Sequence, residues 1–335
     1  MNAPKTALIV AGPTCSGKSA LALDLARTFR GTVINADSMQ VYRDLHILTA
    51  RPDAVDEAAV PHRLYGVLDA ATPGSVAWWR SQALAEMEEA WALERLPILC
   101  GGTGMYLRAL TDGLVEVPDP GDEARQEARA LAEEIGPAAL HARLAEVDPK
   151  TAETLRPNDT QRISRAWEVW RGTGRGLVWW RAQPGLPPAP CRFVSVLLDP
   201  PRDVLRQSLN MRFEQMLEAG ALEEVRRLVA RGLDSVLPAM RAHGVPELAA
   251  VLQGEMTLEA AQQAAVLAIG RYTRRQATWF RHHPLGLEAD AMISFRRYAP
   301  FAQESKTEYE KIENFISGRV DDTPQPVLNP APHTP

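Results

Sequence analysis

Cysteine and long apolar runs are both scarce in this sequence. The 335 residues contain only Cys15, Cys100 and Cys191, an odd and widely spaced set that excludes a disulfide framework and paired zinc-ligand spacing. The first apolar run, residues 7–11, is too short for a signal sequence. No stretch approaches the roughly 20 apolar residues that cross a bilayer. We therefore expect a reduced, soluble, cytoplasmic protein without a membrane partner.

An excess of positive charge is also missing. Lys and Arg number 37 against 42 Asp and Glu, for a net charge of −5, which over the whole chain disfavours a nucleic-acid partner. Hydrophobic residues make up 45% and charged residues 24%, which is ordinary globular usage and excludes wholesale disorder. The length is sufficient for about two domains.

Short apolar runs alternate with helical patterns over much of the chain. Residues 6–11, 32–35, 97–100 and 193–198 have the composition of buried strands, whereas 18–30 and 76–95 show helical spacing of apolar residues. This alternation is typical of βαβ units. We predict an α/β fold, with a P-loop NTPase-like core whose parallel sheet is flanked by helices, and with an all-helical insertion domain.

The insertion is marked by a change of composition. Residues 118–121 are Pro-Asp-Pro-Gly, residues 122–180 are rich in Ala, Glu and Arg, and a Pro-rich segment at 184–190 follows. We expect 1–117 to form the first part of the core, 118–190 the helical insertion, and 191–317 the second part of the core. Five prolines and few apolar residues predict a disordered tail at 318–335.

A phosphate-binding motif lies between the first strand and the first helix. The residues that satisfy G-x4-G-K-[ST] are Gly12, Pro13, Thr14, Cys15, Ser16, Gly17, Lys18 and Ser19. In such a loop the backbone N–H groups and the helix N-terminus surround phosphate oxygens. We expect Lys18 to reach the outer phosphates and the Ser19 hydroxyl to ligate Mg²⁺. The simpler alternative is a glycine turn with a solvated lysine.

Two further strand ends carry polar residues. A nucleotide hydrolase normally adds an apolar strand that ends in Asp, but here residues 97–100 lead into Gly101-Gly-Thr103-Gly. Glycines and a hydroxyl suit close approach to an anion, and an ordinary strand-to-helix turn fits equally well. Asp37 follows the second strand and should lie near the phosphate loop and Thr103, because ligands bind at the carboxyl ends of parallel strands. The ordinary role of an isolated Asp is a helix cap or a turn.

The blocks taken together have a specific order. After the phosphate loop come Asp37-Ser-Met-Gln-Val-Tyr42, Thr49-Ala-Arg-Pro52, Gly101-Gly-Thr-Gly-Met-Tyr106, Asn158-Asp-Thr-Gln-Arg-Ile-Ser-Arg-Ala166, Leu237-Pro-Ala-Met-Arg241 and Arg274-Arg-Gln-Ala-Thr-Trp-Phe-Arg281. This ordered set resembles the bacterial tRNA dimethylallyltransferase family, also called tRNA isopentenyltransferases. The resemblance covers about residues 7–281.

The resemblance implies a transferase that moves a dimethylallyl group from its diphosphate to N6 of the adenosine 3′ of the anticodon in tRNA, with Mg²⁺ and with release of diphosphate. Asp37 occupies the family position of the base that removes the N6 proton, and Thr103 that of a second catalytic residue. The phosphate loop would then hold a leaving group, which accounts for the missing aspartate after residue 100.

The resemblance also implies contacts with the tRNA anticodon stem-loop. The residues implied are Asp37, Ser38, Met39, Gln40, Thr103, Arg125, Gln161, Arg162, Ile163, Ser164, Arg165, Arg241, Arg275 and Arg281. Six arginines against two carboxylates at 156–181 give a local charge of +4, and residues 271–281 are basic without an acid. Four tryptophans between 167 and 180 could stack bases; for Trp167 and Trp170 the helical spacing favours packing. We expect a monomer.

Departures from the family pattern leave alternatives open. The family usually continues after Arg241 with Gly-Tyr-Arg-Gln, whereas this chain has Gly244-Val-Pro-Glu247, so no role is carried over to residues 245–247. A P-loop small-molecule or nucleoside kinase would share the phosphate loop and could use Asp37 as its base. A nucleotide switch that binds RNA without transfer chemistry is a third possibility.

Overall fold

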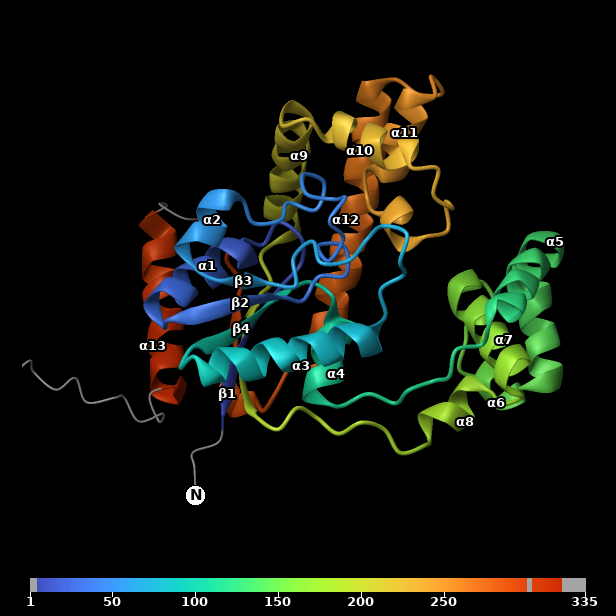
Figure 1. Ribbon diagram of the computed structural model, residues 1–335, viewed down its shortest axis with the longest axis horizontal. Coiled ribbons are helices and arrows are strands. Elements are labelled where there is room, and N and C mark those ends of the chain that lie inside the picture. The colour runs from blue at the N-terminus through green and yellow to red at the C-terminus, as the bar shows by residue number, and fades with distance from the viewer. Residues whose placement is uncertain (1–4, 300–302, 321–335) are drawn as a thin grey trace, which may run out of the picture. The chain divides into compact units, whose positions relative to one another are not determined.

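The computed structural model describes residues 5–299 and 303–320 (Figure 1). The chain divides into two compact units. One joins the chain up to Thr111 to the chain from Ala189 onward, and the other is Asp112–Pro188. The second unit is therefore inserted into the first.

The first unit is built on one parallel sheet. Its six strands, within the described residues, lie in the order β3-β2-β4-β1-β5-β6. The strands are β1 (Thr6–Ala11), β2 (Gly31–Asn35), β3 (His62–Arg63), β4 (Leu96–Gly101), β5 (Arg192–Leu198) and β6 (Ala291–Ser294). All neighbours pair in parallel, with Leu8 opposite Ile98 on one side of β1 and opposite Val194 on the other. The predicted α/β fold with a parallel sheet is confirmed.

Alternate residues of β1 face two different cores, because successive side chains of a strand point to opposite faces. Ala7, Ile9 and Ala11 belong to a cluster with Trp79 and Leu107. Leu8 and Val10 belong to a second cluster that includes Leu21, Leu25, Ile312 and Ile316. Burial on both faces explains the unbroken apolar runs of the central strands.

Helices cover both faces of this sheet (Figure 1). The helices α1 (Lys18–Thr28) and α13 (Gln303–Val320) pack on one face, and α3 (Val76–Ala92) and α4 (Gly104–Thr111) on the other. The remaining elements of this unit are α2 (Ala54–Ala59), α9 (Arg202–Glu218), α10 (Ala221–Ala230), α11 (Val245–Leu252), α12 (Leu258–His282) and the 3₁₀ turns η1 (Pro238–Arg241) and η2 (Glu288–Asp290).

The second unit is helical. It contains α5 (Asp122–Val147), α6 (Pro149–Ala152), α7 (Thr160–Thr173) and α8 (Leu177–Arg181), with a single antiparallel bridge between Leu114 and Leu186. Its core includes Leu140, Leu144, Ile163 and Trp167. Helix α5 is broken at Gly136, where φ is 76° and ψ is 166° and Pro137 follows, since proline removes a backbone donor.

Several boundaries differ from those predicted. The first helix ends at Thr28, two residues before the expected Arg30. Helix α13 extends to Val320, so residues 318–320 of the expected disordered tail are helical and the apolar face of Ile312 and Ile316 explains why. The rest of that tail, 321–335, lies outside the described residues. The edge strands β3 and β6 were not predicted because they contain two and four residues.

Candidate active site

The phosphate loop connects the end of β1 to the start of α1. Gly17 has φ 91°, a left-handed conformation that favours glycine, and Cys15 also has a positive φ of 67°. The Lys18 Nζ atom lies 3.4 Å from the Pro13 carbonyl oxygen, to which it donates. Because helix α1 begins at Lys18, its unpaired N–H groups face the loop. This arrangement suits an anion.

Burial shifts the pKa values of Lys18 and of the neighbouring Cys100 thiol. Loss of hydration lowers the pKa of Lys18 below its ordinary value, and the carboxylate of Asp37 opposes this effect. Burial likewise raises the pKa of the Cys100 thiol to about 11. An anion bound beside Lys18 would therefore compensate the lysine ammonium group for its lost hydration.

Asp37 is held by the end of β2. The buried Asn35 accepts a hydrogen bond from the Asp37 backbone nitrogen through Oδ1 (2.8 Å), and its Nδ2 donates to the Asp37 carbonyl oxygen (3.0 Å). Asp37 Oδ1 accepts from the Met39 backbone nitrogen (2.9 Å), which is the turn contact expected of an isolated Asp. The side chain also lines a cavity together with Lys18 and Ser19. The turn therefore orients the carboxylate toward the phosphate loop's cavity.

Thr103 lies where β4 meets the end of β2. A Cβ on Gly101 would come within 2.1 Å of the Ala36 carbonyl group, so only glycine permits this approach. The Thr103 nitrogen then donates to the Ala36 oxygen (3.1 Å), and its Oγ1 accepts from the Ser38 nitrogen (2.9 Å). The expected proximity of Thr103 to the Asp37 segment is present.

Helix α12 contributes a residue for which the sequence predicted no role. The buried side chain of Gln276 accepts hydrogen bonds from Thr14 N (3.0 Å) and Thr14 Oγ1 (3.2 Å), and its Nε2 donates to the Gly102 oxygen (2.9 Å). Gln276 thus joins the phosphate loop to the β4 end. The sequence contained one indication that Gln276 is buried, because helical spacing places it on the same face of α12 as Thr273 and Phe280.

Tyr272 lies one turn before Gln276 in α12. Burial, followed by the neighbouring Asp37 carboxylate, raises the pKa of Tyr272 to about 12. Its ring centroid lies 5.0 Å from that of His243. These residues place neutral aromatic groups beside Asp37 at physiological pH.

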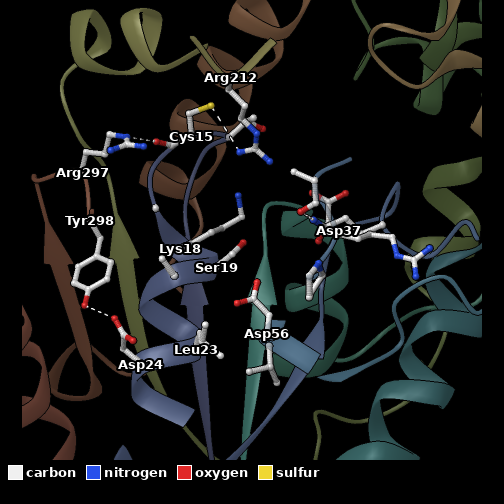
Figure 2. Close-up of a pocket in the computed structure, with 18 of the residues that line it drawn as sticks. Cys15, Lys18, Ser19, Leu23, Asp24, Asp37, Asp56, Arg212, Arg297 and Tyr298 are labelled. Atoms are coloured by element: carbon white, nitrogen blue, oxygen red, sulfur yellow. Dashed lines mark hydrogen bonds between the residues drawn. The ribbon is translucent and has the colours of Figure 1, made fainter. Parts of the chain in front are cut away.

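A single cavity of about 1080 Å³ contains the phosphate-loop side of this site. Figure 2 shows Lys18, Ser19, Asp37 and Arg212 around it. Arg212 comes from α9, and its Nη1 lies 3.8 Å from Cys15 Sγ. Arg297, from the chain after β6, reaches the loop from the other side. Neither arginine was among the predicted site residues.

Oxygen donors in the cavity suit a Mg²⁺ ion bound to a diphosphate. The Ser19 hydroxyl is exposed to the cavity, and the Asp37 carboxylate lines the same space. Within the described part of the chain, no group of three or more His, Cys, Asp or Glu side chains is arranged to hold a metal. A small donor set completed by water and phosphate oxygens is typical of Mg²⁺.

Gln40 and Ile163, two of the predicted RNA contacts, are buried in the structure. Gln40 is buried, and its Nε2 donates to the oxygens of Thr49 (2.9 Å) and Ala50 (3.1 Å). Its amide hydrogens therefore hold the chain's own loop. Ile163 is 0% exposed, because helix α7 turns its side chain into the core of the second unit, and its contact with tRNA stays a prediction.

Several predicted arginines of the second unit have acidic neighbours. Arg125 bonds Asp119 (2.6 Å) and Asp122 (2.8 Å), Arg162 lies 3.5 Å from Asp159, and Arg165 bonds Glu168 (3.0 Å). Gln161 is exposed, and Ser164 is half-buried. Trp167 is packed in the core with its ring 5.2 Å from Trp170, which is the packing arrangement that their spacing favoured.

The other predicted arginines belong to the first unit. Arg241 and Arg275 are exposed, and the Arg275 guanidinium lies 5.6 Å from the Tyr272 ring centroid. Arg281 bonds the buried carboxylate of Asp199 (3.0 and 3.4 Å). The segment at 245–247 begins helix α11, where Glu247 accepts from the Gly244 nitrogen (3.1 Å).

Two family models match this chain. Residues 40–283 match the model described as IPP transferase, and residues 5–72 match the model described as isopentenyl transferase. Among the described residues, no helix has the length and apolar character that crossing a membrane requires.

Relatives that carry the name tRNA dimethylallyltransferase cover nearly the whole chain. The chain is 80% identical to a tRNA dimethylallyltransferase of Gluconobacter oxydans (strain 621H) over 326 residues, which is 96% of this chain and 98% of that protein. It is 61% identical to a tRNA dimethylallyltransferase of Gluconacetobacter diazotrophicus, over 94% and 95% of the two chains.

Solved structures show the same architecture. A full-length tRNA isopentenylpyrophosphate transferase from Bacillus halodurans superposes with a TM-score of 0.66 at 32% identity, covering 96% of this chain and 98% of that one. A eukaryotic dimethylallyltransferase seen acting on tRNA gives a TM-score of 0.75 at 25% identity, covering 94% and 80%.

Proposed function

The chain belongs to the tRNA dimethylallyltransferase family, and from that premise we propose that it transfers a dimethylallyl group from dimethylallyl diphosphate to tRNA. The acceptor is N6 of the adenosine immediately 3′ of the anticodon, and diphosphate is released. The observation that carries this proposal is one cavity lined by both a phosphate loop and the Asp37 carboxylate.

The reaction exchanges one bond for another. The bond between C1 of the dimethylallyl group and its diphosphate oxygen breaks, and a bond between C1 and adenosine N6 forms. The N6 proton passes to a carboxylate oxygen of Asp37. An exocyclic amine has a delocalised lone pair and is a weak nucleophile, so a positioned base contributes typically 10²–10⁴-fold.

The leaving group carries the developing charge. N–H groups of the loop, the Lys18 ammonium and the Thr103 hydroxyl are the donors that support stabilisation of the diphosphate. Ser19 is the residue proposed to hold Mg²⁺, which supplies charge neutralisation to the diphosphate when bound. Thr103 donates 3.3 Å to Ser38 Oγ in the structure, and it can redirect that hydrogen to an anion.

The kinase alternative is less well supported. A kinase would share the loop and the Asp37 base, but the relatives of this chain are transferases. Strand β4 ends at Gly101 rather than at an acidic residue. A nucleotide switch would have no need of the Asp37 carboxylate in the same cavity as the loop.

The tRNA side of the proposal rests on exposed and half-buried groups. We infer that a monomer binds the anticodon stem-loop with Ser38, Met39, Gln161, Arg241 and Arg275, and more weakly with the ion-paired Arg125, Arg162, Arg165 and Arg281. The backbone of the Gln40 segment remains a candidate contact. Arginines near tryptophans are typical platforms for unstacked bases.

The test is incubation of the protein with labelled dimethylallyl diphosphate, Mg²⁺ and bulk tRNA, followed by nucleoside analysis. We expect N6-dimethylallyl adenosine, and its absence would overturn the proposal. Asp37→Asn should retain tRNA binding and lose about 10²–10⁴-fold in single-turnover rate. Asp203→Asn, which changes an exposed carboxylate at the start of α9, is the matched control and should react at the native rate.

A further inference from the structure

The chain that follows β6 packs against the phosphate loop. Arg297 donates from Nε to the Cys15 carbonyl oxygen (3.1 Å), and the Tyr298 backbone nitrogen donates to the Ser16 carbonyl oxygen (3.0 Å). Figure 2 shows Arg297 and Tyr298 beside the loop. Both matched family models end at or before residue 283, so they do not include this segment.

These contacts fix two peptide groups of the loop. The N–H of the first group, that of Ser16, donates to the Pro13 carbonyl oxygen (3.2 Å), whereas the second group contains the Gly17 N–H. In a trans peptide the N–H and the C=O point in opposite directions. Because the Ser16 carbonyl is directed at Tyr298, the N–H of the same peptide group, that of Gly17, points away from Tyr298. The contact therefore fixes the direction of the Gly17 N–H, a donor of the phosphate loop, before a ligand binds.

The Cys15 conformation needs an external constraint. Its φ of 67° is left-handed, which is unfavourable for a residue with a side chain. The Arg297 hydrogen bond to the Cys15 carbonyl and the Arg212 contact to Cys15 Sγ hold this residue from two sides. Without these two contacts, the unfavourable backbone conformation of Cys15 would relax, and the loop would lose its shape.

Tyr298 also joins the loop to the helix that follows it. Its hydroxyl donates to Asp24 Oδ2 (2.7 Å) in α1, and its side chain is 6% exposed. A Cβ on Gly17 would lie 2.0 Å from the Tyr298 carbonyl oxygen, so the segment fits closely against the loop. One residue thus contacts both the loop and α1.

We propose that Arg297 and Tyr298 are positioning residues that hold the phosphate loop in its anion-binding shape before the diphosphate arrives. A loop ordered in advance binds more tightly because less conformational freedom is lost on binding. The identity of the anion rests on the proposed function, whereas the positioning itself does not require transfer.

The first test measures binding of inorganic diphosphate with Mg²⁺ to the full chain by calorimetry. Arg297→Met and Arg297→Lys should each weaken binding about 10-fold, the factor expected for loss of a typical hydrogen bond. Tyr298→Phe keeps the backbone contact and should weaken binding by a smaller factor. Arg319→Met is the matched control, since Arg319 contacts the carbonyl oxygens of Ala289 and Phe315 in the same C-terminal segment.

The lysine variant separates positioning from direct charge attraction. Native-like affinity in Arg297→Lys would overturn positioning and assign Arg297 to direct contact with the anion. Native-like affinity in Arg297→Met, or an equal loss in Arg319→Met, would overturn the proposal altogether.

A second readout follows the loop itself. Backbone amide exchange at residues 12–19 should be faster in Arg297→Lys than in the native chain without ligand, and diphosphate should suppress the difference. In the transfer assay the KM for prenyl diphosphate should rise about 10-fold while the KM for tRNA stays unchanged. Failure of the native chain to transfer would reject the proposed function, and unchanged exchange and binding in the variants would reject the positioning role.

Discussion

The Oγ1 atom of Thr103 lies 2.9 Å from the backbone nitrogen of Ser38 and accepts its hydrogen bond. This contact joins the end of β4 to the residue that follows Asp37 at the end of β2. The position of the carboxylate therefore depends on a hydroxyl from the loop that follows a different strand.

Replacement of Thr103 tests this relationship. Thr103→Ala removes the acceptor for the Ser38 N–H and a donor for the leaving diphosphate, so the single-turnover rate should fall about 10-fold or more. Affinity for tRNA should fall less. Thr103→Ser retains the hydroxyl and should recover most of the rate. Equal losses of rate and tRNA affinity in the alanine variant would contradict a special role for Thr103.

The substitution Gln276→Glu tests the connection that Gln276 makes between Thr14 and Gly102. A carboxylate still accepts from Thr14, but it cannot donate to the Gly102 oxygen and repels it. We expect a loss of about 1–3 kcal/mol in the free energy of unfolding and a slower transfer at saturating substrates. Chemical denaturation and single-turnover assays measure these effects. Gln263→Glu changes an exposed glutamine of the same helix, and a comparable effect there would refute the bridge.

Lys18 should affect stability and function in opposite directions. Because its pKa in the folded chain is below the ordinary 10.5, the unfolded chain binds more protons between those two values. The free energy of unfolding should therefore rise with pH across that window. Lys18→Met should abolish this rise in denaturation curves, stabilise the fold, and lose most diphosphate affinity. An unchanged pH dependence in the variant would exclude a lowered pKa of the half-buried Lys18 as its cause.

Two arginines of α12 should affect different properties when replaced. Arg275 is exposed, so Arg275→Ala should lower the number of counterions released on tRNA binding by about one, as measured from the dependence of affinity on salt concentration. The free energy of unfolding should not change. Arg281→Ala leaves the buried Asp199 carboxylate unpaired and should lower the free energy of unfolding by about 1–3 kcal/mol. Restoration of stability in Asp199→Asn/Arg281→Ala would confirm the cause. An intact stability of Arg281→Ala would instead leave Arg281 available for RNA.

Local patterns were sufficient for the central site. The phosphate loop is a contiguous stretch, Asp37 follows an apolar strand, and Thr103 follows another, so sequence position alone indicated that they meet at one sheet edge. Ile163 shows the limit of such reasoning. A motif is a string of letters, whereas exposure depends on which face of a helix is turned to the core.

The sequence by itself determined the α/β class, the order of the central strands along the chain, and the residues that we propose touch phosphate and remove a proton, because each depends on neighbours within a few positions. Only the tertiary structure decided what holds them in place. Gln276 contacts Thr14 across 262 residues, and Arg297 contacts Cys15 across 282. Hydrogen bonds between such distant residues leave no local pattern, since they form only after the sheet brings both segments together.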